Sequence, residues 1–394
     1  MKADSTEISA RTRYFRYAVF SLTALLVMSL GMVLIPHQPP APAETPFSER
    51  ARAAATADTL ALLAAGKELA GAAAGAGVPG DTATLDRVVT LLTIQARALL
   101  LPGDTAASPI RTAVGQTAAL EPSAGRVPSP AGSTSAVPTT VADLAAALSA
   151  SGAKRLTDAL EADGGMARLL AGAGAAQLLV AREVAATAGI PAEELPGWQK
   201  PDGPDGQVTG VPAECPSAGP SAEGEDYRDG AGSGASAGVA PALTAALDSE
   251  LEIVYGYQAA LTRLDPAAAA QASGLLAEHL ELAEQAEAYA AMHCATVPPT
   301  QPGYVLDNAF LSAPAAGLAQ LESGTLRAFG DVVAFSTGPT RGWAVPALVA
   351  AAQRTSLWGG DPGAVPGLEL DESQLPPLPD PPGNAVPTTS GPAT

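Results

Sequence analysis

The pattern of apolar and polar positions along the chain predicts an all-helical protein. Apolar residues recur at spacings of three and four over long stretches, which is the period of one face of an α-helix. β-branched runs with alternating polarity are scarce, and this argues against a large sheet. Pro and Gly cluster between the Ala-rich runs, as they do in linkers. The predicted fold class is all-α, with an N-terminal transmembrane or signal helix followed by two helical bundles.

The N-terminal helix is predicted from a long uncharged apolar run at residues 18–35. The basic residues before it are Lys2, Arg11, Arg13 and Arg16. At about 1.5 Å per residue the run spans about 27 Å as a helix, close to the roughly 30 Å of a bilayer's hydrocarbon core. The basic flank predicts that the N-terminus stays in the cytoplasm and that everything after Pro36 lies outside.

Two interpretations of residues 1–36 remain open, a signal anchor and a cleaved signal peptide. The length of the run favours the anchor, which would make this a single-pass protein of the cell membrane with its C-terminal part extracellular. Ala41-Pro42-Ala43 offers a small-residue cleavage motif, and cleavage after Ala43 would make the protein secreted. In both cases residues 18–35 are the part that meets the membrane.

The rest of the chain alternates between helical and Pro-rich stretches. The predicted parts are a Pro-rich linker at 37–46, a helical bundle at 47–189 with an internal linker at 103–138, a disordered linker at 190–239, a four-helix bundle at 240–360 and a disordered Pro-rich tail at 361–394. The expected helices span about 48–74, 81–101, 140–160 with Gly152 as a candidate break, 165–188, 241–264, 266–293, 312–335 and 343–358. Whether 47–189 forms one bundle or two helical hairpins remains open.

Three apolar stripes of the second predicted bundle each hold one polar residue near the middle. These residues are Glu250, His279 and Glu322, one on each of the first three helices. Ferritin-like bundles bind two metal ions with inward carboxylates and histidines placed in this way on facing helices.

Short motifs around these positions resemble a ferritin-like domain of unknown function found in exported proteins of high-GC Gram-positive bacteria. The motifs are Ala246-Leu247-Asp248-Ser249-Glu250, Tyr255-Gly256-Tyr257, Glu278-His279, Leu321-Glu322, and Arg354 with Trp358. The resemblance covers residues 241–367, a third of the chain. It implies a ferritin-like four-helix fold and no known activity.

A dimetal centre needs more ligands than this bundle supplies. It requires a Glu-x-x-His pair on each of two helices, and position 276, three residues before His279, is Leu. The predicted fourth helix contains no Asp, Glu or His. We therefore expect no metal or other cofactor, and instead a buried polar cluster of Glu250, His279, Glu322 and Arg354. In that cluster the Arg354 guanidinium is expected to bridge the two glutamates.

Charge and cysteine content restrict the possible partners and the compartment. The formal net charge is −19 and the pI about 4.4, so the chain repels nucleic acid, and no nucleic-acid partner is expected. The two cysteines, Cys215 and Cys294, are expected to form a disulfide if the chain is exported. Two free thiols are the alternative, because a linker cysteine has no fixed position that favours pairing.

The sequence contains little that would support catalysis. It has three histidines, no nucleophile–base arrangement and no phosphate-binding loop, so the protein is not expected to be an enzyme. The leading interpretation is a non-catalytic, membrane-tethered or exported envelope protein that binds an unknown envelope protein, peptide or lipid through helical surfaces. The alternatives are a ferritin-like metal or redox enzyme and a structural spacer in the cell wall.

Overall fold

The computed structural model of the chain describes residues 15, 17–26, 44–77, 79–101, 137–197, 215, 238–299 and 301–379. The chain divides into two compact units, Met1–Thr45 and Pro46–Thr394. Every regular element among the described residues is helical, which confirms the all-α prediction. Most of the predicted linkers at 37–46, 103–138 and 190–239 lie outside the described residues.

The first unit contains a short apolar helix at Tyr17–Leu26, which overlaps the predicted membrane segment. The remainder of that segment and the Ala41-Pro42-Ala43 motif lie outside the described residues. Among the described helices, only α5 (Gly164–Thr187) is long and apolar enough to cross a membrane, but 72% of its most apolar window is buried inside the fold. We therefore interpret α5 as a core helix of the second unit.

Two helix pairs form the N-terminal half of the second unit. They are α2 (Phe47–Ala76) with α3 (Pro79–Leu99), and α4 (Val141–Glu161) with α5. Thr140 begins α4 with a capping box, in which its side chain accepts a hydrogen bond from the Asp143 backbone N–H and the Asp143 carboxylate accepts one from Thr140 N–H.

Glycines bring α4 and α5 into close contact. The predicted break at Gly152 does not occur, and α4 continues through this residue. A Cβ atom at Gly152 would lie 2.9 Å from the carbonyl oxygen of Gly174 on α5. Gly152 therefore serves close helix packing rather than a helix end.

A buried arginine joins α2 to α4. Arg155 is 2% exposed, and its guanidinium contacts the Asp58 carboxylate at 3.1 Å and donates a hydrogen bond of 2.7 Å to the Thr59 hydroxyl. It also donates to the carbonyl oxygen of Ala55. These partners compensate for the burial of its charge.

Five helices make up the C-terminal half. They are α6 (Val239–Leu261), α7 (Pro266–Met292), α8 (Asn308–Ser312), α9 (Pro314–Phe335) and α10 (Gly338–Leu357). Asp265 caps α7, because its carboxylate accepts hydrogen bonds from the backbone N–H groups of Ala267 and Ala268.

Two helix boundaries differ from the predictions. Ser312 ends the short helix α8, which Asp307 caps, so Ser312 does not cap the third long helix. Helix α10 begins at Gly338-Pro339 and not near residue 343, because the backbone N–H groups of a helix's first turn have no acceptor within the helix and proline can stand there. This earlier start places Pro346 inside the helix rather than in its first turn.

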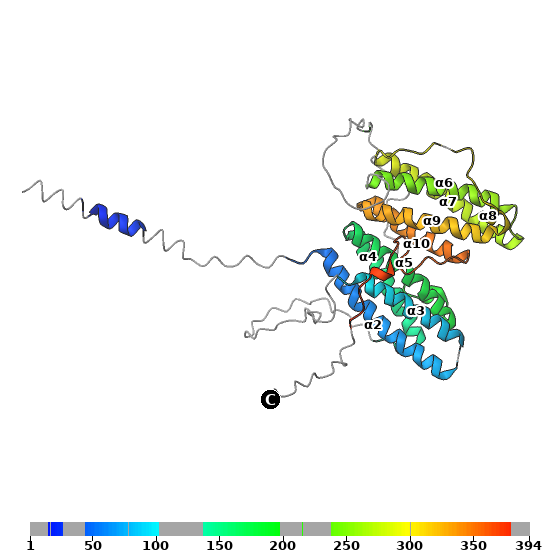
Figure 1. The fold of residues 1–394 in the computed structure, drawn as a ribbon, viewed down its shortest axis with the longest axis horizontal. Helices are drawn as coiled ribbons and strands as arrows, with labels where there is room; N and C mark the ends of the chain where they lie inside the picture. The colour runs from blue at the N-terminus through cyan, green and yellow to red at the C-terminus, as the bar shows by residue number, and fades with distance from the viewer. Residues whose placement is uncertain are drawn as a thin grey trace, which may run out of the picture. The chain divides into compact units, whose positions relative to one another are not determined.

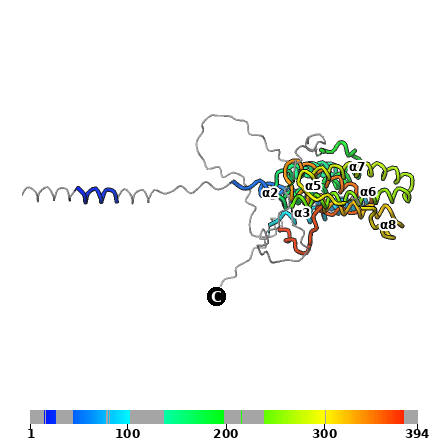
Figure 2. Tube along the Cα trace, turned by 90° about the horizontal axis from the view of Figure 1, so that it is seen from above, coloured from blue at the N-terminus to red at the C-terminus, as the bar shows by residue number. Residues whose placement is uncertain are grey.

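The two halves share one hydrophobic core. Helix α5 packs against α9 and α10, and the same cluster of buried residues contains Leu156 and Leu170 from one half and Phe329 and Leu348 from the other. Figure 1 shows the helices in successive layers, from α6 and α7 through α9 and α10 to α4 and α5, and then to α2 and α3. In the view turned by 90° (Figure 2), α6, α7 and α8 reach farther to the right than α2 and α3, as they do in Figure 1. The sequence predicts two separate bundles, whereas the structure joins them in one compact unit.

The first part of the predicted disordered tail is packed onto the helices. Residues 361–379 are described, and Val365 is 3% exposed within the shared core. The prediction of disorder from residue 361 onward is therefore corrected for this segment, while residues 380–394 lie outside the described part. The proline content of residues 361–379 favours disorder, but an extended segment rich in proline can still be held by hydrogen bonds to its carbonyl groups.

Candidate functional site: a buried ionic centre

The four predicted polar residues meet at one place in the C-terminal half. Glu250 lies on α6, His279 on α7, Glu322 on α9 and Arg354 on α10. The first three are 0% exposed and Arg354 is 4% exposed. The spacing of three and four brings Glu250, His279 and Glu322 to the inner face, because each of these three occupies a position of its helix's apolar stripe.

His279 links the two carboxylates. Its Nδ1 lies 2.7 Å from Glu250 Oε2, and its Nε2 lies 3.0 Å from Glu322 Oε1. A neutral imidazole carries a proton on only one nitrogen, so donation to both carboxylates requires the doubly protonated form. The geometry therefore favours a histidinium between two carboxylates.

Arg354 contacts only one of the glutamates. Its Nε donates a hydrogen bond of 3.0 Å to Glu322 Oε2. The prediction that Arg354 bridges both glutamates is thus wrong, and His279 has that role because it lies between the two carboxylates. Within the described residues, Arg354 Nη2 and Glu250 Oε1 have no hydrogen-bond partner.

Two aromatic residues complete the centre. The Tyr257 hydroxyl donates a hydrogen bond of 2.6 Å to Glu322 Oε1, and Trp358 Nε1 donates one of 2.7 Å to the Tyr257 oxygen. In the sequence, both residues stand out only as landmarks of the resemblance. Their positions could have indicated that they lie near the centre, because Tyr257 follows Glu250 by seven residues on one stripe and Trp358 follows Arg354 by four.

The charges of the centre sum to zero when both carboxylates are ionised and both bases are protonated. Burial alone lowers the pKa of His279, but its hydrogen bonds to Glu250 and Glu322 and their negative charges outweigh this and raise that pKa. Burial likewise raises the pKa of Glu322, yet the hydrogen bond from His279 and the positive charge of Arg354 lower it overall. Burial and the charge of Glu322 raise the pKa of Tyr257, which keeps its hydroxyl a donor.

These pKa shifts predict a defined pH dependence of stability. The pKa of His279 is raised from 6.5, so its contribution is complete below that pH and is lost as the pH rises through the folded-state pKa. The pKa of Glu322 is lowered from 4.5, so its contribution is complete above that pH and is lost as the pH falls through the folded-state pKa. Urea unfolding should show a larger stability advantage of the wild type over His279→Leu at pH 6 than in alkaline solution. An advantage that does not change with pH would contradict this assignment.

A second set of contacts fixes the end of α7 against α10. Trp343 Nε1 donates a hydrogen bond of 2.8 Å to the Gln285 side-chain oxygen, and the rings of Tyr289 and Trp343 stack with their centroids 4.8 Å apart. His293 Nε2 lies 2.8 Å from the Thr340 hydroxyl. These contacts help to hold α7, and with it His279, in place.

The structure pairs Cys215 with Cys294 in a disulfide whose Cα atoms are 5.5 Å apart. This is the pairing that the sequence analysis expects for an exported chain. The bond attaches residue 215 to the end of α7. It also means that Cys294, next to His293 in the sequence, is not a free thiol.

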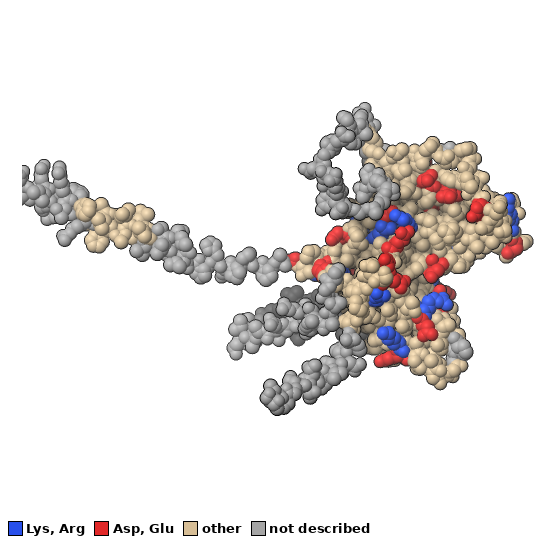
Figure 3. All heavy atoms as spheres, in the orientation of Figure 1, with Lys and Arg blue, Asp and Glu red and all other residues tan. Residues whose placement is uncertain are grey.

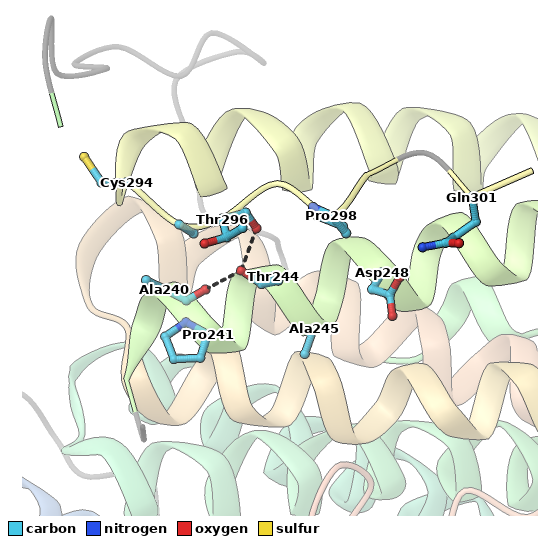
Figure 4. A pocket seen from close by; sticks show the side chains of 10 residues that line it. Ala240, Pro241, Thr244, Ala245, Asp248, Cys294, Thr296, Pro298 and Gln301 are labelled. Atoms are coloured by element: carbon cyan, nitrogen blue, oxygen red, sulfur yellow. Dashed lines mark hydrogen bonds between the residues drawn. The ribbon is translucent and has the colours of Figure 1, made fainter. Parts of the chain in front are cut away.

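An open groove of about 610 Å³ lies beside the disulfide, between the start of α6 and the chain that follows α7. Figure 4 shows Thr244 at its centre, where the Thr244 hydroxyl donates a hydrogen bond of 2.8 Å to the Thr296 carbonyl oxygen. Asp248 is the only charged residue that lines it among the described residues. The groove therefore does not offer the convergent charged groups of a catalytic pocket.

The surface in Figure 3 gives no sign of a basic patch. On the face shown, Asp and Glu are spread among fewer Lys and Arg. This agrees with the net charge of −19.

A comparison with protein families gives one match. The family model described as "Domain of unknown function (DUF4439)" matches residues 242–370. The matched range contains Glu250, Tyr257, His279, Glu322 and Arg354, together with Trp358. No curated protein and no solved structure matches the chain.

Proposed function

We propose that this chain is a non-catalytic envelope protein, tethered to or exported across a membrane by its N-terminal segment, that binds a partner through its helical surfaces. In this proposal the C-terminal helices are a ferritin-like bundle in which an ionic centre replaces the dimetal centre. The observation that carries the proposal is the buried network of Glu250, His279, Glu322 and Arg354.

The contacts of the centre support a structural role. Each oxygen of Glu322 already accepts hydrogen bonds, from Tyr257 and His279 on one side and from Arg354 on the other. A metal ion would have to displace these donors, and it would meet two positively charged side chains. Because the four groups neutralise one another, the bundle needs no metal to balance its buried charge.

The proposed location outside the cytoplasm has two supports. The basic residues before the apolar run favour an N-terminus that stays in the cytoplasm. The disulfide between Cys215 and Cys294 is of a kind that persists in oxidising compartments and is rare in the cytosol.

A pair of reporter fusions after Pro46 tests the location. We expect a reporter that requires export to be active and a reporter that folds only in the cytoplasm to be silent. A matched fusion with Leu25 and Leu26 replaced by arginine should reverse the result, because two charges in the apolar run oppose insertion. Activity of the cytoplasmic reporter alone in the unchanged sequence would refute the proposed export.

A further inference from the structure

The segment after α10 is held on the helices in an unusual way. We call residues 361–379 the strap. It includes one short 3₁₀ turn, Glu372–Gln374, and otherwise contains no regular element. Residues 361–370 of the strap belong to the range that the family model matches. The helices α3 and α5, on which the strap lies, are outside that range.

Side chains of the helices bind the main-chain carbonyl groups of the strap. Gln95 Nε2 donates a hydrogen bond of 2.8 Å to the Ala364 carbonyl, and Arg168 Nε donates one of 2.6 Å to the Gly367 carbonyl. Arg97 donates to three further carbonyl groups at 2.7 to 3.0 Å, those of Glu372, Leu375 and Pro376. Helices α3 and α5 thus recognise an extended chain by its backbone, as peptide-binding surfaces do.

Glycines form the floor on which the strap lies. A Cβ atom at Gly172 on α5 would lie 2.5 Å from the Pro366 carbonyl oxygen and 2.7 Å from Val365 Cγ1. A Cβ atom at Gly330 on α9 would likewise collide with the Gly367 carbonyl oxygen. The Val365 side chain is buried at this place. The floor therefore selects a close backbone approach with one small apolar side chain pointing inward.

Two of the three binding side chains, Gln95 and Arg168, are also held by residues outside the strap. Gln177 Nε2 donates a hydrogen bond of 2.7 Å to Gln95 Oε1, and Arg168 pairs with the Asp331 carboxylate at 2.5 Å. Gln95 is 0% exposed and keeps a further bond to the Ala173 carbonyl. These contacts would keep the donors in place if the strap left, which is the preorganisation that tight peptide binding needs.

We propose that α3, α5 and α9 form a groove for an extended Val-Pro-Gly-type peptide of a partner protein, and that the strap fills this groove as an internal ligand. The strap supplies the chemistry of the expected partner, which is an extended backbone with free carbonyl groups and a valine before a proline. A hollow of about 270 Å³ beside the strap, lined by Ile94 and Leu326, leaves room for side chains longer than its own. This inference rests on the proposed binding role and names its surface and its partner class.

One glycine just before the strap and one at its start shape the chain at the place where it would have to bend away for a partner peptide to enter. Gly359 and Gly363 have positive φ values of 84° and 78°, a conformation that other residues rarely adopt. The strap's contacts to α3 and α5 are made by side chains, so release breaks no ladder of backbone hydrogen bonds.

An exchange experiment on the full chain tests the proposal. A site for a specific protease is inserted between the exposed Asp361 and the half-buried Pro362, and the uncut protein serves as the folding control. After cleavage, a fluorescent peptide of residues 362–379 is added, and its binding is followed by anisotropy and native mass spectrometry. We expect the labelled peptide to replace the cleaved strap, and the same peptide with aspartate in place of Val365 to bind about tenfold more weakly or worse.

Matched glycine variants separate groove binding from general adhesion. Gly172→Ala should weaken peptide binding by about tenfold or more, since its Cβ occupies the place of the peptide backbone. Gly71→Ala should leave binding unchanged, because a Cβ there meets nothing within 4 Å. The proposal is overturned if the labelled peptide does not enter, if a scrambled peptide or the Gly172→Ala variant binds equally well, or if cleavage itself abolishes the helical circular dichroism. None of these outcomes would alter the export result with the reporters.

Discussion

Replacement of His279 by leucine is expected to lower the free energy of unfolding by about 3–5 kcal/mol. The substitution removes the cation between Glu250 and Glu322 and leaves two buried carboxylates, one of which keeps no charged partner. Urea unfolding followed by circular dichroism near pH 6 measures the loss.

A matched histidine variant serves as the control. His293→Leu removes one hydrogen bond to the Thr340 hydroxyl, so we expect it to cost only about 0.5–1.5 kcal/mol. Adding Glu250→Gln to His279→Leu should recover part of the loss, because the unpaired carboxylate is gone. Equal effects of His279→Leu and His293→Leu would show that the bridge has no special role in stability.

Replacement of Arg354 by alanine is expected to cost a similar amount, about 3–5 kcal/mol, by a different route. Arg354 is buried, and its Nε–H binds the one oxygen of Glu322 that His279 does not contact. Its removal leaves the centre with a net negative charge and Glu322 Oε2 without its donor. Thermal and urea unfolding of the variant measure the effect.

Arg327 provides the control on the neighbouring helix α9. Its ion pair with Glu369 is exposed on both sides, with side chains 66% and 82% accessible. Arg327→Ala should therefore change the free energy of unfolding by no more than about 0.5 kcal/mol. A loss below about 1 kcal/mol for Arg354→Ala would mean that Glu322 finds another partner or is protonated without cost.

The sequence contained most of the information about the C-terminal centre. The spacing of apolar residues placed Glu250, His279 and Glu322 on inner faces, because a helix repeats every 3.6 residues whatever it packs against. It did not give the contacts among them. Which carboxylate Arg354 binds depends on the rotation of α10 about its axis. The sequence does not fix where α10 begins, because Gly338-Pro339 is compatible with the end of one helix and with the start of the next.

The joining of the two halves could not be predicted from local patterns. Small residues such as Gly152 and Gly172 give little periodic signal, yet they decide how closely α4, α5 and the strap approach one another. The strap contains the residues that usually indicate disorder, and only the positions of Gln95, Arg97 and Arg168 in space show that its carbonyl groups are bound. Long-range contacts of this kind depend on the assembled fold and not on neighbouring residues.

We propose that the C-terminal helices hold a self-neutralised ionic centre that binds no metal ion. The test is to equilibrate the purified protein with iron, manganese and zinc, remove the unbound metal, and measure the bound metal by elemental mass spectrometry. We expect far less than one metal ion per chain, with no difference between the wild type and Glu322→Gln. One or two metal ions per chain that disappear in Glu322→Gln would contradict the proposal.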